Sequence, residues 1–153
     1  MRDAAVPAAD IVTPNQFELE FLTGHTVVSQ TDVLAACERL HAMGPKVILV
    51  TSVLTDETPV TSIDLIASGP DGRLLLRTPR LDVSLNGAGD AIAALFFLHL
   101  KRTGSAAAAL QAAGSSVYGL LRRTFEASSK ELLMVEAQDE LVQPSTVFEP
   151  LKL

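Results

Sequence analysis

Hydrophobic and polar positions alternate with the period of a helix between residues 29 and 43. Ser29 or Thr31 supplies a cap at the start of this segment, and Gly44-Pro45 ends it. The side chains of one face are mostly apolar, namely Val33, Leu34, Cys37, Leu40 and His41. The pattern predicts an amphipathic helix with an apolar inner face.

Strand patterns lie on both sides of this helix. Lys46 to Thr51 (KVILVT) is a short continuous run rich in β-branched residues, typical of a strand that is buried on both faces between helices. Ala8 to Val12 predicts a shorter strand, which ends at Thr13-Pro14 because proline restricts the preceding residue to extended geometry. A further helix is expected from Gln16 to Thr23. This order of elements favours an α/β sheet.

The middle of the chain predicts an antiparallel hairpin. Its two strands are residues 62–67 and 73–77, and the turn between them, residues 68–72, contains proline and two glycines.

Two alanine-rich helices are expected after the hairpin, from residue 88 to 102 and from residue 105 to 125, with Gly104 between them. The secondary structure of residues 130–142 is ambiguous: residues 132–135 have the composition of a strand, and residues 137–142 have that of a helix.

Composition narrows the class of protein. The chain has 153 residues, of which 48% are hydrophobic and 20% charged, and this predicts one globular domain over residues 1–153. A net charge of −6 without a basic stripe argues against a nucleic-acid partner. We expect no membrane segment, because no apolar run reaches the roughly 18 residues that a spanning helix needs. The N-terminus lacks the pattern of a secretory signal, so a cytoplasmic location is expected.

Cys37 is the single cysteine, which excludes an internal disulfide, and its helical setting predicts a buried thiol. The three histidines are scattered and have no cysteine cluster beside them, so a structural zinc site is not expected.

A glycine-rich turn, Asn86-Gly87-Ala88-Gly89-Asp90, precedes the first alanine-rich helix. Glycines allow a tight turn, and the start of a helix directs unpaired N–H groups and the positive end of the helix dipole toward one point, where a phosphate fits. Asp90 stands in the first helical turn, where an attacking hydroxyl could transfer its proton. The turn predicts an anion hole with a base beside it.

The same turn has other interpretations. A plain helix start also favours an acidic residue such as Asp90 near the positive end of the dipole. An Asn-Gly hairpin turn would need a partner strand, and a helix-length apolar segment follows instead. A dinucleotide-binding fingerprint would need a third glycine where Ile92 stands. The phosphate site and the plain helix start both stay open.

A second candidate site lies in residues 13–20, where Asn15 and Glu18 share one face of the predicted helix. A reciprocal capping box explains this pair, and it is the interpretation that this segment alone favours. The functional alternative is a pair that holds water bound to Mg²⁺ beside nucleotide phosphates, since Mg²⁺ uses few protein ligands and keeps several waters.

A third candidate site is Thr51-Ser52, at the end of the buried strand. Ligands of open α/β sheets bind beyond the carboxyl ends of the strands, where these hydroxyls could meet a nucleotide. A polar strand end is the simpler interpretation unless the three candidate sites meet at the same edge of the sheet.

Together these segments resemble the ribokinase-like superfamily of small-molecule kinases, and within it the pyridoxal kinases. The resemblance runs over almost the whole chain and is most specific in residues 10–20, 47–52, 87–90 and 137–141. Residues 10–20 (DIVTPNQFELE) point to pyridoxal kinases rather than sugar kinases. The resemblance implies a three-layer α/β sandwich, with a mostly parallel sheet between helices and an antiparallel hairpin. The chain would form its C-terminal, nucleotide-binding and catalytic portion.

The resemblance also implies an activity, the ATP-dependent phosphorylation of the 5'-hydroxymethyl group of pyridoxal, pyridoxine or pyridoxamine. Asp90 would be the base, and Asn15 and Glu18 would organise Mg²⁺. The anion hole would consist of the backbone N–H groups of Gly87, Ala88 and Gly89. The residues along ATP would be Thr13, Glu18, Thr51 and Ser52. Adenine would lie near residues 78–85 and 111–117. A homodimer is implied for the complete protein, and a monovalent cation such as K⁺ stays open.

The chain departs from these kinases in two respects. Asn86 stands where many of them carry threonine, and they are considerably longer than this chain. We expect the first strands of the sheet and the residues that hold the pyridine ring to be missing here, and the chain alone not to be fully active. Two alternatives stay open: another ribokinase-like kinase acting on a hydroxymethylpyrimidine or a sugar, and a non-catalytic nucleotide-binding or assembly module.

Overall fold

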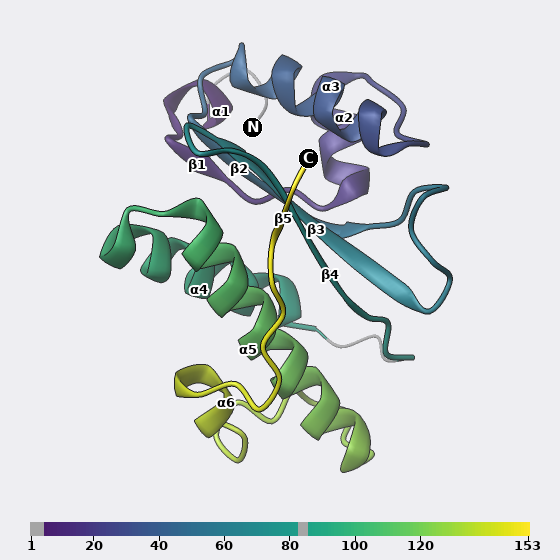
Figure 1. Cartoon of the computed structure of the whole chain (residues 1–153), viewed down its shortest axis with the longest axis vertical. Helices are drawn as coiled ribbons and strands as arrows, with labels where there is room; N and C mark the ends of the chain where they lie inside the picture. The colour runs from purple at the N-terminus through teal and green to yellow at the C-terminus, as the bar shows by residue number, and fades with distance from the viewer. Residues whose placement is uncertain (1–4, 83–85) are drawn as a thin grey trace.

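A computed structural model describes residues 5–82 and 86–153, which form one mixed sheet with helices on both faces (Figure 1). The five strands lie in chain order: β1 (Ile11–Val12), β2 (Val47–Val53), β3 (Ser62–Gly69), β4 (Gly72–Pro79) and β5 (Leu151–Lys152). β1 and β2 are parallel, and every other neighbouring pair is antiparallel. The α/β class is confirmed, but the sheet of this chain is mixed rather than mostly parallel, because β2, β3 and β4 follow one another without crossover helices.

The helices form two layers. One layer contains α2 (Gln16–Thr23) and α3 (Gln30–His41), with the short α1 (Ala5–Ala8) nearby (Figure 1). The other contains α4 (Ala88–Thr103) and α5 (Ala106–Glu126), with α6 (Asp139–Val142) at its far end (Figure 1).

Each helical layer has its own apolar core, and β2 contributes to both. Ile48 and Val50 point toward the layer of α2 and α3, whereas Leu49 between them joins the core beneath α4 and α5. All three side chains are fully buried, as expected for alternate residues of a strand covered on both faces.

Local capping sets the helix limits. Gln16–Thr23 is helical as predicted, and α2 ends at Gly24, which takes a left-handed conformation with φ of 64°. Gly104 does the same between α4 and α5 with φ of 69°, and its N–H donates to the Leu100 carbonyl. Ser29 caps α3 and settles the choice between the two candidate caps.

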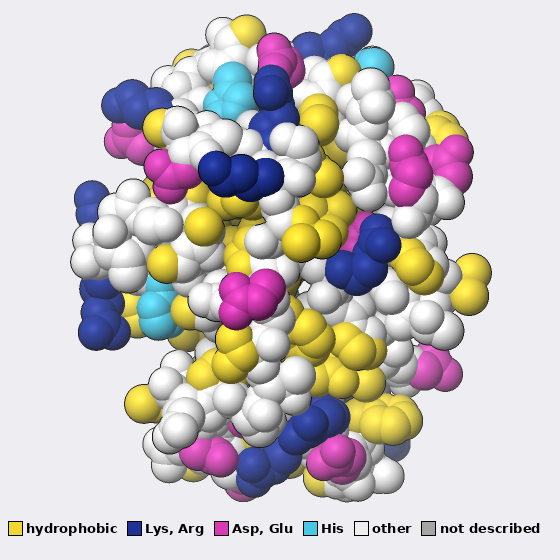
Figure 2. Space-filling model, in the orientation of Figure 1, with side chains coloured by type: hydrophobic (Ala, Val, Ile, Leu, Met, Phe, Trp, Pro, Cys, Tyr) yellow, Lys and Arg dark blue, Asp and Glu magenta, His cyan; other side chains and the backbone are white. Residues whose placement is uncertain are grey.

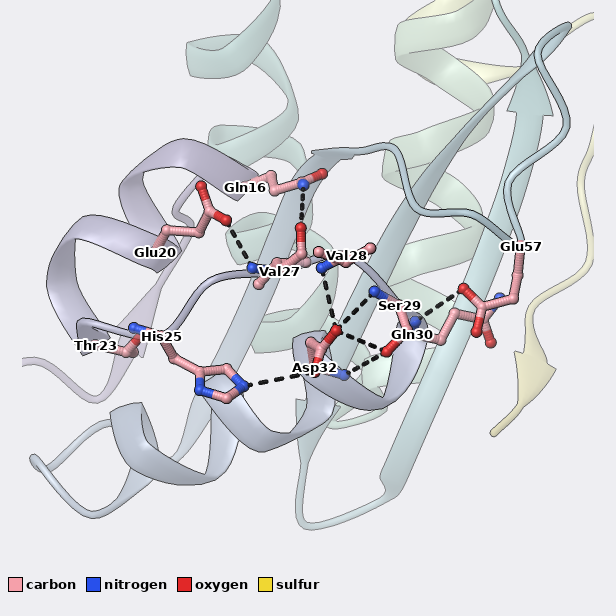
Figure 3. Close-up of polar contacts among 10 residues, drawn as sticks. All are labelled: Gln16, Glu20, Thr23, His25, Val27, Val28, Ser29, Gln30, Asp32 and Glu57. Atoms are coloured by element: carbon pink, nitrogen blue, oxygen red, sulfur yellow. Dashed lines mark hydrogen bonds and ion pairs between the residues drawn. The ribbon is translucent and has the colours of Figure 1, made fainter.

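The loop before α3 is held by three carboxylates (Figure 3). The first is Glu20 of α2, whose Oε1 accepts a hydrogen bond from the Val27 N–H at 2.6 Å. Asp32 Oδ2 accepts hydrogen bonds from the N–H groups of Val28 at 3.1 Å and Ser29 at 2.8 Å, and from the Ser29 hydroxyl at 2.8 Å. Glu57 Oε2, from the loop after β2, accepts from the Gln30 N–H at 3.0 Å. The first N–H groups of α3 are therefore satisfied by side chains.

Three predicted elements differ from the structure. Residues 5–8 are helical, so the strand predicted at Ala8–Val12 is reduced to Ile11–Val12. Residues 132–133 have no regular structure and residues 134–135 belong to a turn, in which the Met134 N–H donates to the nearby Leu132 carbonyl at 2.8 Å. The described chain instead ends in β5, which was not predicted and which pairs Leu151 with Leu75 of β4.

Within residues 5–82 and 86–153, no helix is long and apolar enough to cross a membrane. On the face shown in Figure 2, basic and acidic side chains are interspersed, and hydrophobic side chains show between the two helical layers.

Candidate nucleotide site

The second and third candidate sites meet at the carboxyl ends of β1 and β2. The Thr51 N–H donates to the Pro14 carbonyl at 2.9 Å, and Asn15 forms an isolated parallel bridge with Thr51. The parallel pairing of Ile11 with Val47 continues into this contact, so the register of the two strands brings residues 13–15 beside Thr51-Ser52.

Ser52 has an unusual backbone at this edge. Its φ is 54°, in the left-handed region that non-glycine residues seldom occupy, and it lies where the pairing of β2 with β3 shifts between Val50 and Val53. The shift leaves Ser52 exposed between the buried neighbours Thr51 and Val53. Strained backbone of this kind clusters at ligand sites, which makes Ser52 a functional candidate on geometric grounds.

A cavity of about 600 Å³ opens beside these strand ends. It joins parts of the three predicted sites, because its lining includes Asn15, Thr51 and Ser52 on one side and Ala88 and Gly89 of α4 on the other. The three candidate sites therefore converge on one edge of the sheet, which was the condition for a ligand site rather than a polar strand end.

The start of α4 has backbone N–H groups that no side chain caps. Gly87 is the N-terminal cap with φ of 90°, a conformation that favours glycine, and no side chain caps the helix there. The first intrahelical bond runs from Ala91 N–H to the Gly87 carbonyl at 2.9 Å, so the N–H groups of Ala88, Gly89 and Asp90 lie ahead of the helical ladder. Space around Gly89 is open, since an added Cβ would meet no atom within 4 Å.

Four predicted site residues do not line the cavity: Thr13, Glu18, Gly87 and Asp90. Gly87 and Asp90 are exposed on either side of the lining residues Ala88 and Gly89. Thr13 is half-buried directly after β1.

Glu18 lies in the first turn of α2 and forms the capping box with Asn15. The Glu18 N–H donates to Asn15 Oδ1 at 2.8 Å, and the Asn15 N–H donates to Glu18 Oε2 at 2.9 Å. The simpler interpretation of this pair is thus present, and it holds Asn15 at the cavity edge.

The segments predicted to surround adenine also reach the cavity. Residues 78–82 line it, whereas residues 83–85 lie outside the described residues. Gly114 and Val117 line it from α5, while Gln111 borders a smaller cleft of about 200 Å³ elsewhere. Gly114 lets α5 approach the sheet closely, because a Cβ at this position would overlap Leu76.

Some lining residues were not predicted. Tyr118 and Leu121 extend the wall begun by Gly114 and Val117, and Leu54, Ile63, Leu65 and Ile92 add apolar surface. The spacing 114, 117, 118 and 121 follows one face of a helix, so the periodicity of α5 contains the signal once one member is placed.

Strand ends beside an uncapped helix start opened by glycine are an arrangement typical of phosphate-binding α/β proteins. The chain belongs to the phosphomethylpyrimidine kinase family, whose model matches residues 1–134.

Its relatives include pyridoxal kinases. It is 54% identical over 151 residues to the pyridoxal kinase PdxY of Granulibacter bethesdensis, covering 96% of this chain and 53% of that protein. It is 48% identical to the pyridoxal kinase PdxY of Corynebacterium diphtheriae, covering 97% and 53%. The solved pyridoxal kinase of Leishmania donovani in complex with ADP and pyridoxamine is 26% identical with a TM-score of 0.85, covering 98% and 54%. The chain spans about half the length of the relatives it matches.

Proposed function

We propose that this chain is the nucleotide-binding and catalytic portion of a kinase that phosphorylates the 5'-hydroxymethyl group of pyridoxal, pyridoxine or pyridoxamine with ATP. The observation that carries the proposal is the single cavity that brings the strand-end residues Asn15, Thr51 and Ser52 to the start of α4. The pyridoxal kinases among its relatives, and the ADP and pyridoxamine bound by the Leishmania enzyme, support the choice of nucleotide and acceptor.

The start of α4 would stabilise the transferring phosphoryl group. The backbone N–H groups of Gly87, Ala88 and Gly89, at a helix start without a side-chain cap, would need little reorganisation when charge develops on the phosphoryl oxygens. The acceptor hydroxyl oxygen forms a bond to the γ-phosphorus while the bond from that phosphorus to the ADP oxygen breaks. The hydroxyl proton passes to the Asp90 carboxylate, which is exposed in the first turn of α4.

The strand ends would bind the rest of the nucleotide. Thr51 and Ser52 offer hydroxyls at the cavity. Thr13 directly follows β1, and Glu18 lies in the first turn of α2. In this arrangement positioning and preorganised N–H dipoles do most of the catalytic work.

Asn15 and Glu18 fit a water-mediated Mg²⁺ site. The capping box uses Oδ1 of Asn15 and Oε2 of Glu18, and carboxylate oxygens can accept further hydrogen bonds. Mg²⁺ commonly takes one or two protein oxygens and completes its shell with water and phosphate oxygens. When bound, the ion would neutralise charge on the phosphates.

Three further statements stay predictions: a requirement for a monovalent cation such as K⁺, a homodimer of the complete protein, and a cytoplasmic location.

A direct test is calorimetric titration of the folded chain with a nonhydrolysable ATP analogue and Mg²⁺. Saturable binding that disappears when the metal is chelated supports the proposal. A folded chain that binds neither the analogue nor ATP contradicts it and favours an assembly role.

A second candidate acceptor is a hydroxymethylpyrimidine, which the description of the matching family favours. Transfer of labelled phosphate from ATP to pyridoxal but not to hydroxymethylpyrimidine, with both offered in equal amount, would support the first candidate.

A further inference from the structure

The end of the chain crosses α5 and returns to the sheet (Figure 1). We define residues 144–153 as the C-terminal strap. Its first part is held by two side chains: the Ser145 N–H donates to Glu140 Oε2 at 2.8 Å, and Arg122 Nη2 donates to the Ser145 hydroxyl at 3.0 Å. Its last part pairs with β4 as β5, where the Leu153 N–H donates to the Arg73 carbonyl at 3.0 Å. The strap is thus fixed at both ends.

Phe148 lies between these two anchors and contacts α5 through backbone and ring. Its N–H donates to the buried Ser115 hydroxyl at 3.1 Å. Its ring meets the ring of Tyr118 edge to face, with centroids 4.9 Å apart and planes at 84°. This is a favoured geometry for an aromatic pair, because the positive edge of one ring meets the negative face of the other.

Tyr118, the partner of Phe148 in this contact, also lines the cavity. Among the cavity-lining residues within 5–82 and 86–153, Tyr118 has the sole aromatic ring, and it stands beside Val117 and Leu121 on α5. The backbone of α5 fixes the Cα of Tyr118 but leaves its side-chain torsions to be set by neighbours. Phe148 is such a neighbour.

We propose that Tyr118 is the wall on which the base of the bound nucleotide rests, and that Phe148 of the C-terminal strap is a positioning residue that holds the Tyr118 ring. This rests on the proposed nucleotide site. Any nucleobase can stack on an aromatic side chain because every base has a π-face, and a ring fixed in advance loses less freedom on binding. The strap therefore contributes to affinity for the base without touching the phosphates.

The test compares binding of a ligand that contains the base with binding of one that contains only phosphates. Phe148→Leu, and Phe125→Leu as its matched control, are titrated in the full 153-residue chain with two Mg²⁺-loaded probes: a nonhydrolysable ATP analogue and inorganic tripolyphosphate. Phe125 is a half-exposed phenylalanine at the end of α5 that does not line the cavity. We expect Phe148→Leu to weaken the analogue roughly three- to tenfold, as for loss of one aromatic pair, and to leave tripolyphosphate within about twofold. Phe125→Leu should change neither affinity.

Two further variants keep the result interpretable. Phe148→Tyr retains the ring and should bind the analogue as the parent chain does. Tyr118→Leu should reproduce the loss, and adding Phe148→Leu to it should cost nothing more, because the positioned ring is already gone.

Different outcomes overturn different statements. Unchanged analogue affinity in a folded Phe148→Leu chain, or an equal loss for both probes, overturns the positioning role. Equal losses in Phe125→Leu overturn it too, since any lost ring would then have the same effect. A parent chain that binds neither probe overturns the proposed function itself, and the positioning role with it.

Discussion

Asp90 occupies the first turn of α4 with its side chain exposed, next to the cavity-lining Ala88 and Gly89. If Asp90 is the base, Asp90→Asn removes the carboxylate that accepts the proton and keeps nearly the same side-chain shape. We expect phosphate transfer to fall by at least about a hundredfold, the usual contribution of a general base, with nucleotide affinity nearly unchanged. Transfer assays and calorimetry on the same preparation measure both. Lost nucleotide binding by a folded variant would contradict the assigned role.

Ser52 gives a prediction about strain. Valine cannot adopt φ of 54° without clashes, so Ser52→Val should lower the free energy of unfolding by about 1–3 kcal/mol. Ser52→Gly should change it by less than about 1 kcal/mol, because relief of strain is offset by greater freedom of the unfolded chain. Urea denaturation distinguishes the two; equal losses would mean that the hydroxyl, and not the backbone, matters.

The cavity-lining residues that could be predicted from the sequence lie at the ends of strands and at the starts of helices. Asn15, Thr51, Ala88 and Gly89 follow from strand ends and helix starts, which local sequence indicates. Tyr118 belongs to the site only because Gly114 lets α5 lie close to the sheet, and this distance depends on packing between segments far apart in the chain.

The start of α3 gives a pH-dependent prediction at the scale of one element. The Ser29 hydroxyl, followed by the N–H groups of Ser29 and Val28, lowers the pKa of Asp32 in the folded chain. A lowered pKa stabilises the fold above the pKa of the unfolded chain, and the stabilisation is lost as pH falls through the folded pKa.

At pH 7, Asp32→Asn should therefore unfold at a lower urea concentration than the parent chain. This difference in urea midpoint should shrink as the pH is lowered below about 4, the ordinary pKa of aspartate. The exposed Glu131→Gln is a matched control that should show no such convergence. A gap between parent and Asp32→Asn that is constant with pH would contradict the role of the charge.

The β3–β4 hairpin contains an ion pair between a buried carboxylate and a partly exposed arginine. Asp64 is fully buried and accepts from Arg77 Nε and Nη2, each at 2.7 Å, and from the Thr58 hydroxyl at 2.8 Å. The contact with Asp64 raises the pKa of Arg77.

Arg77→Met leaves the Asp64 charge unpaired, and we expect it to lower the free energy of unfolding by about 2–4 kcal/mol, less than for a wholly buried pair because Arg77 is one-third exposed. Arg39→Met, at an exposed position of α3, is the control for losing an arginine. Guanidinium denaturation measures both, and equal effects would contradict the pairing argument.

Among the elements, those with a long periodic pattern or a strong turn were predicted well. Helix 16–23 and the hairpin were recognised because caps and turn residues act locally. The two-residue strand β5 was not, since Leu151-Lys152 is extended only because β4 offers a free edge. Residues 132–135 have strand-like composition but find no partner strand within the described chain.

At the scale of the whole molecule, Cys37 reports on opening of the core. It is fully buried, and burial raises the pKa of its thiol to about 12. We expect thiol reagents to label the native chain only when the layer of α2 and α3 opens. Leu40→Ala, in the same core, should speed labelling by at least about 30-fold, because such a cavity costs about 2–5 kcal/mol.

Val60→Ala is the control, since Val60 is 90% exposed and should leave the labelling rate unchanged. Rapid labelling of the native parent chain would contradict the buried position of Cys37.

Two cores share one sheet, and this arrangement follows from the alternation in β2. The alternation was predictable as a strand buried on both faces; which helix covers which face was not, because both helical layers are apolar on one side. The proposed acceptor likewise could not come from composition or periodicity, and depends on family resemblance.

The ring of Tyr118 has one more consequence. The chain contains one tyrosine and no tryptophan, so nearly all of its ultraviolet fluorescence comes from this side chain in the cavity wall. The unmodified protein therefore carries its own optical reporter: light emitted by a single ring will reveal when the cavity fills, without any dye or engineered label.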